Sequence, residues 1–172
     1  MKTKHILYLF IFIGITSCIN NKEYFIFDEV IHYHFEQSQL EKVKTNYSEN
    51  KNQVDTLFDN IFYNSYPISI NDTTFLNSLD LLTSKKQSFK QENKLKEFRK
   101  IFRKRMYNNY EEAACEPLYR DVFIFKNKNK IEGIAKICFE CEKHLIIGSK
   151  ANTHNFGKSG EYKILNQLIE NN

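Results

Sequence analysis

The stretch YRDVFIFKNKNKIEGIAKICFE, residues 119–140, decides the fold class of this chain. Two runs rich in β-branched and aromatic residues flank the polar segment KNKNK, and a third run, KHLIIGS, follows shortly afterwards. Such runs are typical of β-strands, and their short connections favour antiparallel neighbours. We therefore expect an antiparallel three-stranded meander over about residues 119–148.

The segment KNKNK also predicts the register of the first two strands. A turn centred on Lys128 and Asn129 would place Asp121 opposite Lys136. Opposite charges that face each other across two strands attract, so this register predicts a favourable ion pair.

One further strand is predicted near the N-terminus. The segment Val30–Glu36 alternates strictly and is typical of a half-buried strand. Its apolar side carries Ile31, Tyr33 and Phe35, and its polar side carries His32, His34 and Glu36.

About four amphipathic helices complete the prediction. The first ends before Pro67, and the second begins after Asp72, a good N-cap residue. The third covers about residues 88–107, and the last is C-terminal. Their expected buried stripes contain Val54, Leu57, Phe58, Ile61 and Phe62; Phe75, Leu76, Leu79 and Leu82; Leu95, Phe98, Ile101, Phe102 and Met106; and Tyr162, Leu165, Leu168 and Ile169. The fold class is therefore α+β.

The first 17 residues have the parts of a signal peptide, with two lysines before an apolar run of ten residues. That run is too short for a membrane-spanning helix, which needs about 20 residues. The segment ITSC, ending at Cys18, resembles the lipobox of bacterial lipoproteins, which implies a lipid such as palmitate on Cys18 and a membrane anchor. The alternative is an ordinary signal peptide. We expect a signal peptide over 1–17, a lipidated tether over 18–27 and a single domain over 28–172.

Charge and composition exclude some classes of protein. Cleavage removes Lys2 and Lys4 and no acidic residue, which lowers the formal charge from +4 to +2. Such a balance argues against a nucleic-acid-binding protein. The chain has 15 Phe and 10 Tyr, which is typical of a folded domain with an aromatic core.

Three cysteines remain in the mature domain, namely Cys115, Cys138 and Cys141. In the expected meander they gather at one end of the sheet. A disulfide from Cys115 to Cys138 or Cys141 would close a loop of about 25 residues and contribute about 3 kcal/mol. The alternatives are a Zn²⁺ site completed by His144 or His154, a Cu⁺ site made by the thiolates alone, and a redox centre. The carboxylates flanking Cys141 disfavour a thiolate, so the redox alternative is the weakest.

Two other segments invite a functional interpretation. The His-x-His spacing of His32 and His34, with Glu36 two residues further on, occurs in metal sites. We prefer a solvent-facing strand surface, because the sequence indicates no further ligand. The segment Lys94–Arg105 holds seven basic residues. It could contact anionic lipid or an acidic partner, but the exposed face of a helix is the simpler interpretation.

The C-terminal third resembles a group of uncharacterised lipoproteins from Bacteroidetes. The shared pattern is C-x-x-x-Y-R-D-x-x-I-F, then I-C-F-x-C and N-T-x-N-F-G, followed by a final helix. The segments FDEVIHY and NDTTF match more loosely. The matching residues are Cys115, Tyr119, Arg120, Asp121, Ile124, Phe125, Ile137, Cys138, Phe139, Cys141, Asn152, Thr153, Asn155, Phe156 and Gly157. The resemblance implies a lipoprotein with grouped cysteines and supplies no mechanism.

Taken together, these features predict a non-catalytic binding or interaction module, lipid-anchored to the inner or outer membrane with its domain outside the cytoplasm. Its predicted partners are the membrane, through the lipid on Cys18, and a protein of the cell envelope. The alternatives are a Zn or Cu protein that uses the cysteine cluster, and an immunity or inhibitor protein of the envelope. No catalytic residue and no cofactor other than this metal is predicted.

Overall fold

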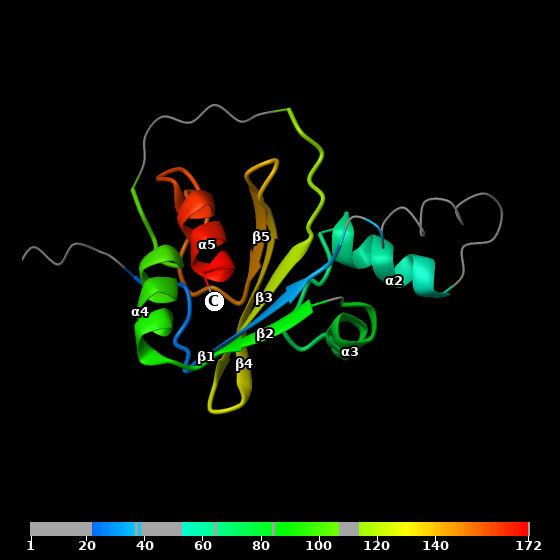
Figure 1. Ribbon diagram of the computed structural model, residues 1–172, viewed down its shortest axis with the longest axis horizontal. Helices are drawn as coiled ribbons and strands as arrows, with labels where there is room; N and C mark the ends of the chain where they lie inside the picture. Colours follow the sequence, from blue (N-terminus) through cyan, green and yellow to red (C-terminus); the bar gives the residue numbers. More distant parts are fainter. Residues whose placement is uncertain are drawn as a thin grey trace, which may run out of the picture.

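The computed structural model describes residues 22–36, 38, 53–63, 65–83, 85–106 and 114–171 (Figure 1). The expected signal peptide and Cys18 lie outside these residues. The described part forms four helices and a five-stranded antiparallel sheet in the order β2-β1-β3-β4-β5, which confirms the α+β class. The elements are β1 (Glu29–His34), α2 (Gln53–Phe62), α3 (Thr73–Leu82), β2 (Lys85–Phe89), α4 (Glu92–Ile101), β3 (Asp121–Asn127), β4 (Lys130–Cys138), β5 (Lys143–Ile147) and α5 (Glu161–Glu170).

The predicted meander is β3-β4-β5, and its first turn is centred as expected. Lys128 and Asn129 have φ angles of 49° and 64°, which is the backbone of a two-residue type I′ hairpin turn. The predicted pairing of Asp121 with Lys136 is wrong by one residue. The register shifts after Phe125, so that Asp121 lies opposite Ile137. A shift of one residue turns a side chain to the other face of the sheet, and the two charges therefore lie on opposite faces.

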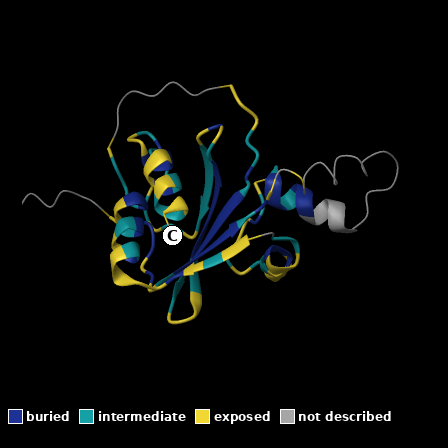
Figure 2. Cartoon of the chain, viewed as in Figure 1, coloured by how far each residue is buried: buried dark blue, intermediate teal, exposed yellow. Residues whose placement is uncertain are grey.

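Helices cover both faces of the sheet (Figure 1). Helices α2 and α3 lie on one face, and α4 and α5 lie on the other. The central strands are accordingly buried on both faces, and most exposed residues lie on the outer sides of the helices and at the turns (Figure 2).

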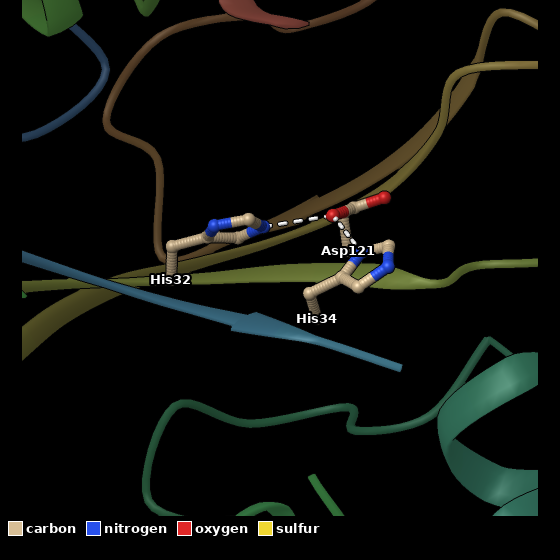
Figure 3. Close-up of side chains that lie close together, drawn as sticks. All are labelled: His32, His34 and Asp121. Atoms are coloured by element: carbon tan, nitrogen blue, oxygen red, sulfur yellow. Dashed lines mark hydrogen bonds and ion pairs between the residues drawn. The ribbon is translucent and has the colours of Figure 1, made fainter. Parts of the chain in front are cut away.

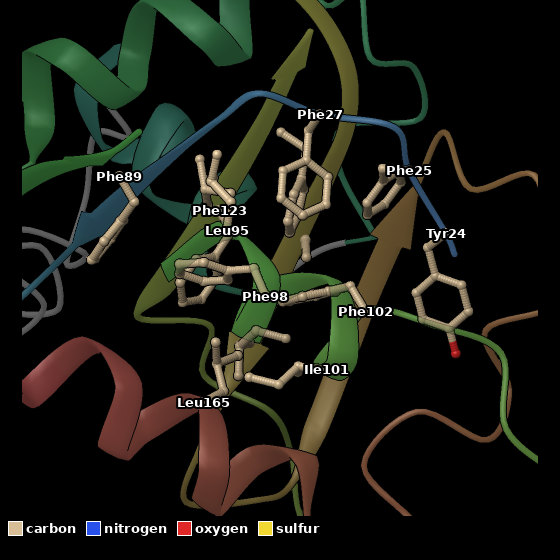
Figure 4. Close-up of a cluster of buried hydrophobic side chains, with 14 of the residues drawn as sticks. Tyr24, Phe25, Phe27, Phe89, Leu95, Phe98, Ile101, Phe102, Phe123 and Leu165 are labelled. Carbon is tan, nitrogen blue, oxygen red and sulfur yellow. The ribbon is translucent and has the colours of Figure 1, made fainter. Parts of the chain in front are cut away.

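Each face has its own apolar core. The core under α4 and α5 is rich in aromatic rings (Figure 4); it contains Tyr24, Phe25, Phe27, Val30, Phe89, Leu95, Phe98, Ile101, Phe102, Phe123, Phe125, Ala135, Ile137, Phe156, Tyr162 and Leu165. The core under α2 and α3 contains Ile31, Tyr33, Phe35, Phe58, Ile61, Phe62, Phe75, Leu79, Val122, Ile124 and Ile134.

The helix predicted over residues 88–107 is wrong at its start. Lys85–Phe89 forms the edge strand β2, in which Lys85 and Lys86 are exposed and Phe89 is buried. Lysines are typical of edge strands because they oppose pairing with another chain. The helix α4 then ends at Ile101, so that Met106, expected in the buried stripe, is 91% exposed. The rest of that stripe is buried as predicted.

Two details at the start of elements also test the sequence analysis. The carboxylate of Asp72 accepts a hydrogen bond of 2.9 Å from the backbone N–H of Phe75, which confirms the predicted N-cap of α3.

The tether predicted over 18–27 is too long. Tyr24, Phe25 and Phe27 are buried, and the backbone N–H of Tyr24 donates to the carbonyl of Phe102, so the packed part of the chain starts before residue 28.

Within the described ranges, each of the four helices is ten residues long, and none is long and apolar enough to cross a membrane.

Candidate functional site

The three cysteines meet at one end of the sheet, as the sequence predicts. Cys115 and Cys141 form a disulfide with a Cα–Cα distance of 5.7 Å. Cys138 is a free, buried thiol whose sulfur accepts a hydrogen bond of 3.4 Å from the backbone N–H of Cys141. Tyr119 and Leu145 pack around these sulfur atoms. The disulfide thus ties the segment before β3 to the turn after β4.

The two histidines that were candidates for a cysteine-based metal site lie elsewhere. His144 is opposite Ile137 on the α4/α5 face, whereas Cys138 points to the other face of β4. The Nδ1 atom of His144 lies 2.8 Å from the hydroxyl of Tyr162. Burial lowers the pKa of His144 to about 4, so its ring is neutral at pH 7. His154 is exposed and lines the same small hollow as His144. The disulfide already uses two of the three sulfur atoms, and the structure brings neither histidine to them.

A different group of side chains comes together where the central strands β1 and β3 meet, at the end of β1 and the start of β3 (Figure 3). The Nε2 atom of His32 lies 2.7 Å from Oδ1 of Asp121, and Nδ1 of His34 lies 2.8 Å from the same oxygen. We call these three residues the His–Asp–His group. In the part of the chain that the structure describes, it is the one group of three or more His, Cys, Asp or Glu residues whose ligand atoms all lie within 4.8 Å of one another.

Strand pairing explains how the sequence assembles this group. β1 and β3 are antiparallel, with His34 opposite Asp121 and His32 opposite Phe123. Alternate residues of a strand point to one face, so the two histidines and the aspartate share the α4/α5 face. The ring of His32 stacks on that of Phe123, with 4.5 Å between centroids and 11° between planes. This stacking fixes the orientation of the imidazole.

Burial and hydrogen bonding act in opposite directions on the pKa of Asp121. Only 7% of its side chain is exposed. Burial acts to raise the pKa of Asp121, but the hydrogen bonds and charge of His32 and His34 outweigh it and hold this pKa below its ordinary value. The carboxylate is therefore ionised at neutral pH and can accept from both rings.

The His–Asp–His group forms part of the wall of a cleft with a volume of about 520 Å³. His32 is buried, but 34% of the His34 side chain remains exposed, so the group can be reached from the solvent. Arg120 and Glu140 form an ion pair at this cleft. The lining residues are His32, His34, Lys85, Gln87, Arg120, Asp121, Phe139, Glu140, Asn166, Ile169 and Glu170.

The structure corrects the expectation for the His-x-His strand. Its polar side is not an open solvent-facing surface: His32 is buried, and His34 is only partly exposed at a cleft that α5 helps to line. Glu36, the acid expected beside the two histidines, is exposed beyond the end of β1 and is not part of the group. The acid that joins them is Asp121, for which the sequence predicts an ion pair with Lys136. To predict Asp121 as the partner of the two histidines, one must know that β1 pairs with β3, and no local sequence pattern shows this pairing.

Lys136 lies on the opposite face, completely buried under α2. Its ammonium donates to the backbone carbonyls of Asn60 and Tyr66, at 3.0 and 2.8 Å. It also lies 4.8 Å from the ring centroid of Tyr119. Burial lowers the pKa of Lys136 to about 7.

Several basic residues of the segment Lys94–Arg105 pair with acidic side chains of the domain. Arg99 contacts Glu92, Lys100 contacts Glu97, and Arg105 contacts the buried Glu161 at 2.8 Å. These pairs agree with an ordinary helix surface.

No protein-family model, curated protein or solved structure matches this chain.

Proposed function

We propose that this chain is a lipoprotein of the cell envelope whose exported domain is a non-catalytic binding module, and that it binds its ligand or partner in the cleft beside β1. The lipid would be on Cys18, and the membrane would be reached through it. The sequence pattern before Cys18 and the resemblance to Bacteroidetes lipoproteins support this location. The Cys115–Cys141 disulfide agrees with it, because disulfides persist in oxidising compartments.

The cleft carries the binding part of the proposal. It combines apolar lining from Phe139 and Ile169 with charged groups from different elements, including Lys85 on β2 and Glu170 on α5. Concave sites with an apolar body and a few placed polar groups are typical of ligand binding. The disulfide stabilises the end of the sheet next to this cleft, since it joins the segment before Arg120 to the turn after Glu140.

Crosslinking in living cells tests the proposed binding surface. A photoreactive residue replaces Gln87 in the cleft or, as a matched control, Lys96 on the exposed side of α4. We expect a specific crosslinked species at residue 87 that is absent at residue 96 and is lost when Arg120→Ala is added. Identical products at both positions, or none at residue 87, would contradict the proposal.

Metabolic labelling with a fatty acid tests the anchor separately. The wild-type chain should incorporate the label and remain with the membrane fraction, and Cys18→Ala should do neither. An unlabelled wild-type chain would remove the anchor and leave the cleft experiment unaffected.

A further inference from the structure

We infer that the His–Asp–His group binds a divalent transition-metal ion such as Zn²⁺, with one coordination position open to the cleft. The inference deepens the proposed binding function and rests on it only in taking the cleft as the place where a ligand arrives. Two imidazoles and one carboxylate are a common Zn²⁺ ligand set, and open sites use three protein ligands and leave the fourth position for water or another group.

The distances suit an ion of this size. Zn–N and Zn–O bonds of about 2.0–2.2 Å place the ligand atoms of a tetrahedral site about 3.3 Å apart. Oδ1 of Asp121 now lies 2.7 Å from His32 Nε2 and 2.8 Å from His34 Nδ1, and all three ligand atoms lie within 4.8 Å of one another. Movements of the order of half an ångström to one ångström in the side chains would therefore form the site.

The hydrogen bonds of the group also permit a metal ion to replace them. Asp121 accepts a hydrogen bond from each ring in the absence of metal, so His32 Nε2 and His34 Nδ1 carry protons. A neutral imidazole can hold its one proton on either nitrogen. On metal binding, each ring would move this proton to its other nitrogen and offer the freed lone pair to the ion.

The surroundings hold the ligands in place and provide access. Both histidines lie on β1, and the aspartate begins β3, so the group stands on the central strands of the sheet. The stacked ring of Phe123 supports His32 and limits its rotation. The partly exposed side of His34 faces the cleft and gives the ion a path from solvent. A site on rigid elements with an entry path satisfies what a metal site requires.

The open position determines the class of group that the bound ion would accept. It faces the cleft, whose lining includes the cations Lys85 and Arg120 and the acids Glu140 and Glu170, with Arg120 paired to Glu140. Oxygen donors with negative charge, such as a carboxylate or phosphate, suit both the ion and these cations. The cleft ligand is therefore expected to carry such a group.

Calorimetric titration with Zn²⁺ tests the site on the full chain in detergent, after free thiols have been alkylated. We expect one equivalent to bind the wild type with a micromolar or lower Kd. Asp121→Asn and His34→Gln should each weaken binding at least about tenfold, since even outer-shell changes cost about 10–100-fold. His154→Gln, which removes an exposed histidine outside the group, should bind as the wild type does.

A spectrum with Co²⁺ in place of Zn²⁺ supplies a second readout. Nitrogen and oxygen ligands should give the visible bands of four-coordinate Co²⁺ without a thiolate charge-transfer band. Unchanged circular dichroism would show that the variants remain folded. The inference is overturned by the absence of stoichiometric binding, by wild-type affinity in both group variants, or by loss of binding in His154→Gln. A negative result here leaves the cleft crosslinking intact, so the two proposals fail separately.

Discussion

On each face of the sheet a charged side chain of a central strand is buried, Lys136 of β4 on one face and Asp121 of β3 on the other, and the two are satisfied in different ways. Under α2 and α3, Lys136 is completely buried and donates to the carbonyls of Asn60 and Tyr66. Under α4 and α5, Asp121 is almost as buried but receives its hydrogen bonds from two histidine rings at the wall of a cleft.

This difference indicates a structural role for Lys136, whereas Asp121 is a candidate functional residue. Backbone carbonyls are fixed parts of the fold, so Lys136 ties β4 to the end of α2 and has no route to an external ligand. Imidazole rings can exchange a proton for a metal ion, and the group around Asp121 is open on one side. The comparison predicts that Lys136 contributes mainly to stability and Asp121 mainly to binding.

The largest expected effect follows from removing the lysine. Lys136→Ala should lower the free energy of unfolding by about 3–5 kcal/mol, because it leaves a cavity and removes the donor for two partly buried carbonyls. Urea denaturation measures this. Lys136→Met keeps most of the volume and should recover part of the loss, while Lys130→Ala at the exposed start of β4 should change little. A Lys136→Ala protein as stable as the wild type would contradict the stabilising role of Lys136.

Loss of the disulfide should rank next. Cys115→Ser frees a loop with a sequence separation of 26 residues, which the chain-entropy model values at about 3 kcal/mol. Dithiothreitol should lower the stability of the wild type by a similar amount and leave the variant unchanged. Zn²⁺ affinity should persist in the folded variant, since none of the three proposed ligands contacts the disulfide. Equal stability of the oxidised and reduced wild type would show that the bond contributes nothing.

Asp121→Asn should cost less stability than Lys136→Ala. The amide keeps one oxygen acceptor and the cleft admits water, so we expect a loss of about 1–2 kcal/mol, within the range for hydrogen bonds to a charged group. Denaturation without metal measures this change. A loss larger than that of Lys136→Ala would indicate that the His–Asp–His group is primarily structural.

The last effect is the smallest at neutral pH, because it develops only in acid, and it concerns His144. Its pKa is about 4 in the folded chain and near 6.5 in the unfolded chain, because burial disfavours the charged ring. Between these pH values the unfolded chain binds the extra proton, so this contribution to stability falls as the pH falls from 6.5 to 4. His144→Gln should flatten the stability profile in this window, and His154→Gln should leave it unchanged. Parallel profiles for wild type and His144→Gln would contradict the prediction.

The sequence predicts those parts of the fold that depend on neighbours along the chain. The meander, the turn at Lys128 and Asn129, the N-cap Asp72 and the gathering of the cysteines all follow from local patterns and short connections. The edge strand β2 was missed because its exposed, lysine-rich sequence lacks the apolar alternation of an internal strand.

The candidate site depends on distant parts of the chain and could be predicted only in fragments. The two histidines were singled out by spacing, but their third partner is 87 residues from His34. The β-bulge between Phe125 and Lys126 also shifts the register and moves Asp121 away from its expected partner. A pairing between β1 and β3 and a one-residue irregularity together decide which charges meet, and neither is visible in a local pattern.

X-ray diffraction from crystals soaked in Zn²⁺, measured at the zinc absorption edge, tests the central claim most directly. We expect an anomalous peak about 2.0–2.2 Å from His32 Nε2, His34 Nδ1 and an oxygen of Asp121. A fully soaked crystal without a peak at these three residues, or with its strongest peak at Cys138, would contradict it.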